Sequence, residues 1–195
     1  MKPNAFLAAT VLSLSLLTGC ANPHPEGKPL PKLDFAHLQY HPVQVGLVDV
    51  VNSYAQNKAT ADAARMYVSP PDEVFTNYLK ARYKPQGGQG RLLFDIKEAS
   101  VYVFHEESDV GVARWVDMAG FEEYSLTLKL HMRAENIPGF YEKTKDFSAR
   151  RRVKISEHAS IAQREQDQFE AMEIMLQEID AAIYKTLREE FLLTP

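Results

Sequence analysis

The sequence predicts an α/β (α+β) fold in which two helices cover one face of a mostly antiparallel sheet. Two hydrophobic periodicities lead to this prediction: alternation at every second residue around 124–132, and a stripe at three- and four-residue spacing through 162–191. The expected order of elements, β-α-β-β-β-α, is typical of a two-layer sandwich. Because a helix separates the first two strands, we expect them to pair in parallel, which makes the sheet mixed.

The first expected strand covers residues 43–52, where an almost continuous apolar run is typical of a strand buried on both faces. This pattern predicts a central position in the sheet. The next element is a helix that starts within 69–73, where a serine cap and a proline at the first helical position precede two acidic residues. The Pro- and Gly-rich segment 84–90 ends this helix.

Three further strands are expected in the middle of the chain. The strand 91–104 changes its buried face near residues 98–99, as happens at a β-bulge. The strand 123–133 alternates apolar and polar residues most regularly, which indicates one buried and one solvated face. Residues 136–139 then form a hairpin turn, and 140–155 form the returning strand.

Charge complementarity suggests a register for this hairpin. If Glu135 lies opposite Phe140, residues of opposite charge face one another across the two strands. The pairs predicted in this way are Arg133 with Glu142, Lys129 with Asp146, and Glu123 with Arg152.

The last predicted element is a long amphipathic helix from Ser160 to about residue 192, with Gln163 completing a capping box. About 32 residues give a length of roughly 48 Å, more than the roughly 33 Å of a ten-residue strand. One end is therefore expected to extend beyond the sheet. Leu187 and Phe191 are candidates for contacting a partner there; the alternative is that the whole stripe packs in the core.

The sequence shows few signs of catalytic or metal chemistry. Six histidines are scattered along the chain without the spacing that places two of them on one face of a helix or strand. The densest group of possible ligands is 105–109, His-Glu-Glu-Ser-Asp, which lacks the spacing of a calcium loop and is typical of a solvated turn. We therefore expect no catalytic residue, no metal and no cofactor.

The distribution of charge is more informative than the net charge of −4. Residues 123–154 contain eight basic and four acidic residues, whereas 160–191 contain eight acidic and three basic residues. Opposite charges at two poles can orient a domain against a partner or an anionic surface. The candidate residues for such a surface are His131, Arg150, Arg152 and Lys154. The alternative is a solvated sheet face; nucleic acid is not expected, since the chain is acidic overall.

The N-terminus indicates export. A basic Lys2 precedes an apolar run over 5–17, which is too short to cross a bilayer but has the length of a signal-peptide core. The tetrapeptide 17–20, Leu-Thr-Gly-Cys, resembles the lipobox of bacterial lipoproteins. That resemblance implies cleavage after residue 19 and diacylglycerol on Cys20; the alternative is an ordinary secretory signal with a chance cysteine.

The N-terminal features also predict how the chain is divided into segments and where in the cell envelope the protein is located. Residues 1–19 would be the signal peptide, 20–33 the lipidated cysteine with a Pro-rich tether, and 34–195 a single periplasmic domain. In Gram-negative lipoproteins an aspartate after the cysteine commonly retains the protein in the inner membrane. Ala21 stands there instead, so the resemblance implies the periplasmic face of the outer membrane.

Taken with the order of elements, the lipobox-like segment and Pro-rich tether are similar to those of small periplasmic lipoproteins that assist envelope transport. These include the lipopolysaccharide-assembly lipoprotein and the auxiliary lipoproteins of ABC-type lipid transporters. The resemblance implies a non-enzymatic accessory role, with membrane contact through the anchor and an envelope protein or a lipid as partner. The alternatives are a hydrolase or metal-binding protein that uses the His105 cluster, and a purely structural tethered scaffold.

Overall fold

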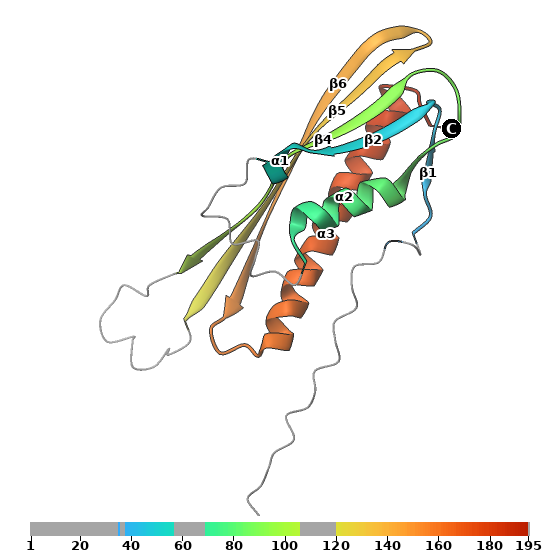
Figure 1. The fold of residues 1–195 in the computed structure, drawn as a ribbon. Helices are drawn as coiled ribbons and strands as arrows, with labels where there is room; N and C mark the ends of the chain where they lie inside the picture. The colour runs from blue at the N-terminus through green and yellow to red at the C-terminus, as the bar shows by residue number, and fades with distance from the viewer. Residues whose placement is uncertain (1–34, 36–37, 57–68, 106–119, 195) are drawn as a thin grey trace, which may run out of the picture.

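A computed structural model describes residues 35, 38–56, 69–105 and 120–194 of the chain. Their elements are β1 (His41–Val43), β2 (Leu47–Asn52), α1 (Ser53–Gln56), α2 (Pro71–Arg82), β3 (Tyr83–Pro85), β4 (Arg91–His105), β5 (Phe121–Ile137), β6 (Phe140–Ser156) and α3 (Ile161–Glu189). Four strands form a sheet in the order β2-β4-β5-β6, and β1 pairs with β3. Helices α2 and α3 lie on the same side of the larger sheet (Figure 1). The predicted two-layer α/β fold with a mixed sheet is confirmed.

Strand β5 carries the most regular part of the core. Its even-numbered residues from Tyr124 to Ala134 are at most 2% exposed, because they face the helices. In β4 the buried set changes parity, since Ile96 and Ala99 are both fully buried and the pairing with β5 shifts between Ile96 and Glu98. The predicted change of face is therefore present, slightly earlier in the strand than expected, and it lets both halves of β4 contribute to the core.

The hairpin between β5 and β6 differs from the predicted register by two residues. Ile137 pairs with Phe140, so the turn consists of Pro138 and Gly139 alone. Proline favours the first central position of a tight turn, and Gly139 takes the second with φ of 104°. As corrected, Arg133 lies opposite Thr144, Lys129 opposite Ser148 and Glu123 opposite Lys154. Side chains alternate with a period of two, so the shift leaves every residue on its predicted face.

Strand β2 lies at an edge of the sheet, which corrects the central position predicted for it. Within the described ranges its one strand partner is β4, with which it pairs in parallel. Leu47 and Val51 point away from the helices and are 49% and 39% exposed. The apolar run therefore reflects burial of one face only, and the order of strands depends on packing that local sequence does not encode.

The helices begin close to their predicted starts. Helix α2 begins at Pro71 with Pro70 as N-cap, so Ser69 does not cap it. At the start of α3 the Ser160 hydroxyl accepts a hydrogen bond from the Gln163 backbone N–H at 3.2 Å, which confirms that cap. Helix α3 has 29 residues, about 44 Å, whereas β5 and β6 have 17 residues each, about 56 Å.

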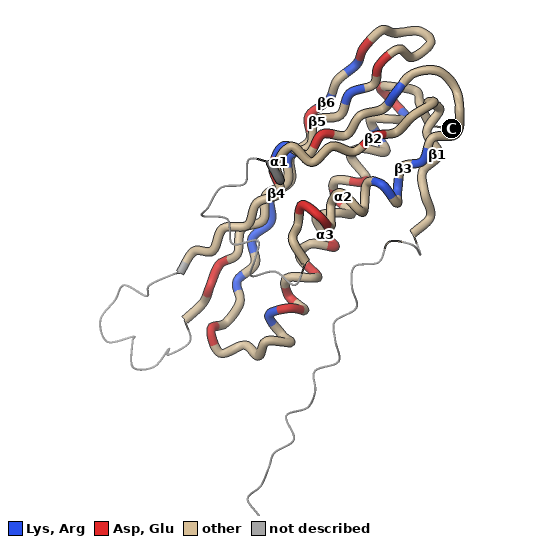
Figure 2. The backbone as a smooth tube through the Cα atoms, viewed as in Figure 1, with Lys and Arg blue, Asp and Glu red and all other residues tan. Residues whose placement is uncertain are grey.

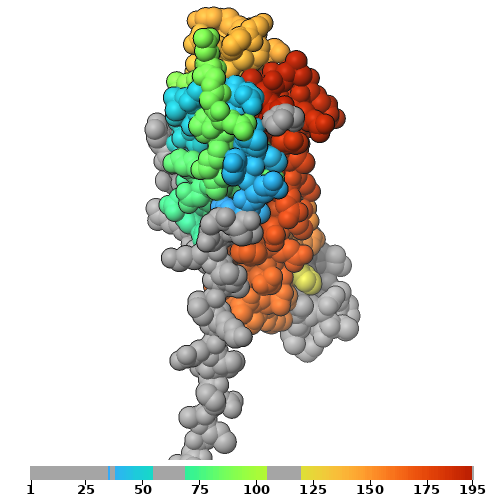
Figure 3. Space-filling view, turned by 90° about the vertical axis from the view of Figure 1, so that its right-hand side faces the viewer, coloured from blue at the N-terminus to red at the C-terminus, as the bar shows by residue number. Residues whose placement is uncertain are grey.

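A backbone hydrogen bond joins the N-terminal and C-terminal parts of the described chain. Beyond α3, the backbone carbonyl of Leu193 accepts a hydrogen bond from the Gln44 N–H at 2.8 Å, just after β1. Figure 3 shows the N-terminal elements packed beside α3, with the β5–β6 hairpin projecting at one end of the molecule. Strand β1 is thus held between β3 and the C-terminal segment.

Candidate functional site

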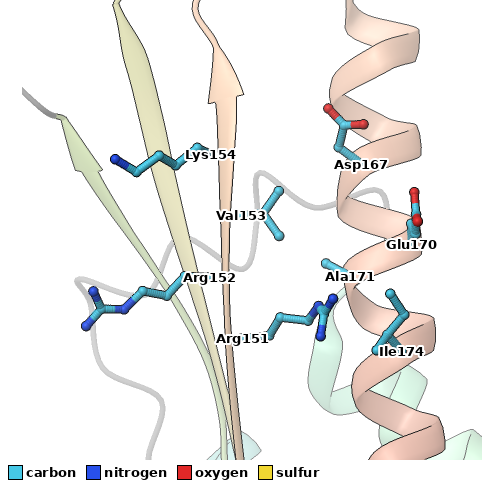
Figure 4. Close-up of a pocket in the computed structure, with 8 residues that line it drawn as sticks. All are labelled: Arg151, Arg152, Val153, Lys154, Asp167, Glu170, Ala171 and Ile174. Atoms are coloured by element: carbon cyan, nitrogen blue, oxygen red, sulfur yellow. The ribbon is translucent and has the colours of Figure 1, made fainter.

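The predicted basic residues of β6 lie on one exposed face of the sheet. Arg150, Arg152 and Lys154, here called the basic cluster, are two residues apart and all exposed. Figure 4 shows that Arg152 and Lys154 point away from α3, whereas Arg151 and Val153 point toward it. The alternation of side chains on a strand thus separates the cluster from the helix layer.

His131 lies on the same face but apart from the basic cluster. Its Nδ1 is 2.7 Å from Asp146 Oδ1, on the residue directly opposite in β6. Arg150 lies opposite Thr127, four residues from His131 along β5, which corresponds to about 13 Å. The structure therefore joins three of the four predicted residues and places the fourth in a separate pair.

Carboxylates lie close to the basic cluster. Arg152 Nη1 is 3.3 Å from Glu123 Oε1. Glu98 is held by Lys129, with 2.6 Å between Nζ and Oε2. Burial works to raise the pKa of Glu98, but the hydrogen bond from Lys129 and the charges of Lys129 and Arg150 bring it below its usual value. Figure 2 shows basic residues along β6 and acidic residues along α3.

Exposed aromatic side chains occupy the same end of this sheet face. Phe104 lies opposite Glu123, which in turn lies opposite Lys154. Phe104 and Phe121 are 53% and 43% exposed. The face therefore combines cationic groups on β6 with apolar rings on β4 and β5.

A groove of about 290 Å³ runs between β6 and α3 (Figure 4). Arg151 and Val153 enter it from the strand, and Ala171 faces them from the helix. Arg151 Nη1 lies 3.5 Å from Glu178 Oε1, a loose ion pair across the two elements. The residues that line the groove are Arg151, Arg152, Val153, Lys154, Asp167, Glu170, Ala171 and Ile174.

A second polar cluster, which the sequence patterns did not indicate, surrounds the buried carboxylate of Asp180 in α3. Its Oδ1 accepts a hydrogen bond from the Tyr83 hydroxyl at 2.6 Å, and its Oδ2 accepts one from Arg82 Nη2 at 3.0 Å. His41 Nε2 lies 3.4 Å from Oδ2. These contacts join β1, the α2–β3 junction and α3. One sequence signal was available: Asp180 interrupts the apolar stripe three residues before Ile183.

The protonation states in this cluster follow from burial. Burial, together with the charge of Asp180, raises the pKa of Tyr83 well above its usual value, so the hydroxyl keeps its proton and donates it. Burial lowers the pKa of His41, although Asp180 favours the charged ring. The ring also stacks on Tyr184 at 4.2 Å. With both oxygens of Asp180 occupied, the cluster fastens three elements together.

The structure corrects the expectation that Leu187 and Phe191 form a partner-binding end of the helix. Leu187 is fully buried and Phe191 is 4% exposed. Phe191 packs on Phe140 of the hairpin, with ring centroids 6.2 Å apart. The physical reason is length: β5 and β6 extend farther than α3, so the end of the helix lies under the sheet.

Other predicted features fall outside the described residues. These are Cys20, the signal peptide 1–19, the tether 20–33, and residues 106–109 of the acidic cluster; His105 ends β4. Among the described residues, no group of three or more His, Cys, Asp or Glu side chains could hold a metal ion. None of the helices in these ranges has the length and apolar character needed to span a membrane.

Comparisons with known proteins give limited similarity. No protein-family model matches the chain, and no curated protein does. Two solved structures can each be aligned with 75% of this chain. Rare lipoprotein B from Shewanella oneidensis aligns over 97% of its own chain, with 13% sequence identity and a TM-score of 0.36. A minor lipoprotein from Acinetobacter baumannii aligns over 92% of its own chain, with 10% identity and a TM-score of 0.37. At these identities and TM-scores the similarity supports no conclusion about function.

Proposed function

We propose that this chain is an outer-membrane lipoprotein, anchored through Cys20, whose domain acts in the periplasm as a non-enzymatic accessory component of envelope assembly or lipid transport. It works by binding an envelope partner that presents anionic groups to the basic cluster. Support for the anchor comes from the sequence of residues 17–20. Support for binding comes from the exposed sheet face, where Arg152 and Lys154 point away from the helix layer (Figure 4).

The observation that carries this proposal is the two-residue spacing of the basic cluster. Side chains two residues apart on a strand are about 7 Å apart on the same face. Arg150 and Arg152 can each donate paired N–H groups to a carboxylate or phosphate. Three basic side chains within five residues make this stretch of β6 locally cationic, and Arg152 is paired with Glu123. Such a cationic stretch attracts and orients an anionic partner.

Charge reversal tests the binding surface. We expect Arg150→Glu with Arg152→Glu to make cells that depend on the protein sensitive to detergent, while the domain still folds. The matched control is Lys185→Glu with Arg188→Glu, which changes charge equally at exposed positions of α3. Detergent resistance equal to wild type in the β6 variant, at equal protein level, would refute the surface part of the proposal.

The anchor is tested separately. We expect Cys20→Ala to abolish labelling with radioactive palmitate and to release the protein from the membrane fraction. Density-gradient separation should place the wild-type protein with outer-membrane markers, and Ala21→Asp should move it to the inner membrane. A Cys20→Ala variant that still incorporates palmitate would contradict lipidation at this residue.

A further inference from the structure

Strand β6 ends the sheet with a long free edge. It spans 17 residues and pairs with β5 on one side. Among the described residues, no strand pairs with its other side. An edge of this kind offers backbone N–H and C=O groups to a further strand.

The surroundings of residues 150–154 suit an added strand. The groove between β6 and α3 lies beside this stretch and is lined by Val153, Ala171 and Ile174 as well as by charged groups. In a strand added at the edge, alternate side chains would point to the groove and to the sheet face of the basic cluster. The first set would meet Val153, Ala171 and Ile174, with Arg151, Asp167 and Glu170 around them. The second set would lie beside the basic cluster.

We propose that the β6 edge over residues 150–154 accepts an extended segment of a partner protein as a fifth strand, with acidic residues at every second position and small or apolar residues between them. The inference rests on the proposed function, because it names the partner chemistry for the same basic cluster. The inference depends on charge complementarity. The cationic side chains of β6 recur at every second residue, which is the spacing of the side chains on one face of an added strand.

A second copy of this chain is a poor occupant of the same edge. Pairing two β6 edges over this stretch would bring Arg150, Arg151 and Arg152 of one copy against the same residues of the other. Like charges opposite one another destabilise a strand pair. The charges therefore discourage self-association at this edge and favour an acidic strand.

The test uses the full lipidated protein in detergent micelles and a fluorescent nine-residue peptide that alternates glutamate with valine and threonine. The control peptide has the same composition in an order that breaks the alternation. Binding is measured by fluorescence anisotropy, and hydrogen exchange reports on the amides of residues 150–154. We expect the alternating peptide to bind at least tenfold more tightly than its control and to slow exchange of those amides.

Variants separate binding at the β6 edge from binding elsewhere on the protein. Arg152→Glu should weaken peptide binding at least tenfold, whereas Lys185→Glu should leave it unchanged. Equal binding of both peptides, or binding without protection of 150–154, would overturn the inference. Binding of phosphatidylglycerol vesicles that is lost in Phe104→Ser, with no peptide binding, would overturn it in favour of a lipid ligand.

The two proposals fail in different ways. If the charge-reversed cells are detergent-sensitive but the peptide does not bind, the edge inference is wrong and the proposed function stands. If the peptide binds with protection but charge reversal leaves cells unaffected, the edge accepts acidic strands and the proposed role in the envelope is wrong.

Discussion

Two charged clusters in this domain differ in what surrounds them. The carboxylate of Asp180 is buried and meets Arg82 and Tyr83 at hydrogen-bond distance. Arg150 and Arg152 lie on an exposed sheet face, where Arg152 pairs with Glu123 and the charge of Arg150 acts on Glu98. The first arrangement balances charge inside the fold, and the second keeps positive potential at the surface. Burial of the partners thus decides whether a charged group serves stability or binding.

The largest effect is expected from removing the centre of the buried cluster. Asp180→Ala leaves Arg82 and the Tyr83 hydroxyl without their acceptor, so we expect a loss of about 3–5 kcal/mol in the free energy of unfolding. Urea denaturation measures this loss. The control is Glu178→Ala on the same helix, whose side chain is 56% exposed and which should cost less than about 1 kcal/mol. Equal losses in the two variants would erase the contrast.

Arg164 is intermediate in exposure between these two clusters. Arg164 in α3 contacts the Glu122 carboxylate and donates to the backbone carbonyls of Ser156 and Glu157 at 3.2 and 3.1 Å. Its side chain is 23% exposed, between the two extremes. We expect Arg164→Ala to cost about 1.5–3 kcal/mol, the usual worth of hydrogen bonds to charged groups. Gln166→Ala, at an exposed position nearby, is the control, and an equal effect there would remove Arg164 from the series.

The histidine of the buried cluster predicts a pH dependence. Burial lowers the pKa of His41 below 6.5, so the unfolded chain takes up a proton more readily than the folded one. Stability should therefore be highest above about pH 6.5 and fall as the pH drops below that value. We expect His41→Gln to lose less stability than wild type between about pH 7.5 and 5.5 in thermal denaturation. Parallel losses in both proteins would show that His41 does not contribute.

The smallest effect on stability is expected at the basic cluster. Arg150→Ala with Arg152→Ala removes exposed side chains and one surface ion pair, so unfolding should change by less than about 1 kcal/mol. The same denaturation experiment measures it. A loss as large as that of Asp180→Ala would mean that the cluster holds the fold together.

Sequence patterns predicted correctly those features that depend on interactions between neighbouring residues. The buried apolar face of β5 and the Ser160 cap are confirmed, because a side chain's face and a helix cap depend on a few adjacent residues. The opposite face of β5 is not solvated throughout, since Ser125 and Thr127 are buried. The hairpin register was wrong by two residues, since weak charge pairs suggested it while the Pro138-Gly139 turn sets it. The position of β2 at an edge depends on distant packing, and the local apolar run could not indicate it.

The two candidate sites differ in the same way: local sequence determines one of them, and distant packing determines the other. The face of the basic cluster follows from parity along β6, which a register error of two residues leaves intact. The cluster around Asp180 joins residues near positions 41, 83 and 180. Local sequence patterns do not reveal tertiary contacts between residues so far apart in the chain. Strands β1 and β3 have three residues each, too few to show a periodicity.

The bond between Gln44 and Leu193 has a consequence for the order in which the domain assembles. A chain synthesised from its N-terminus delivers β1 long before α3 and the segment after it. Because β1 is secured by Asp180 and by the Leu193 carbonyl, its attachment must wait for nearly the whole chain. Contacts between residues so far apart in sequence are slow to form. We therefore expect the hairpin and α3 to assemble first and the N-terminal strand to dock last.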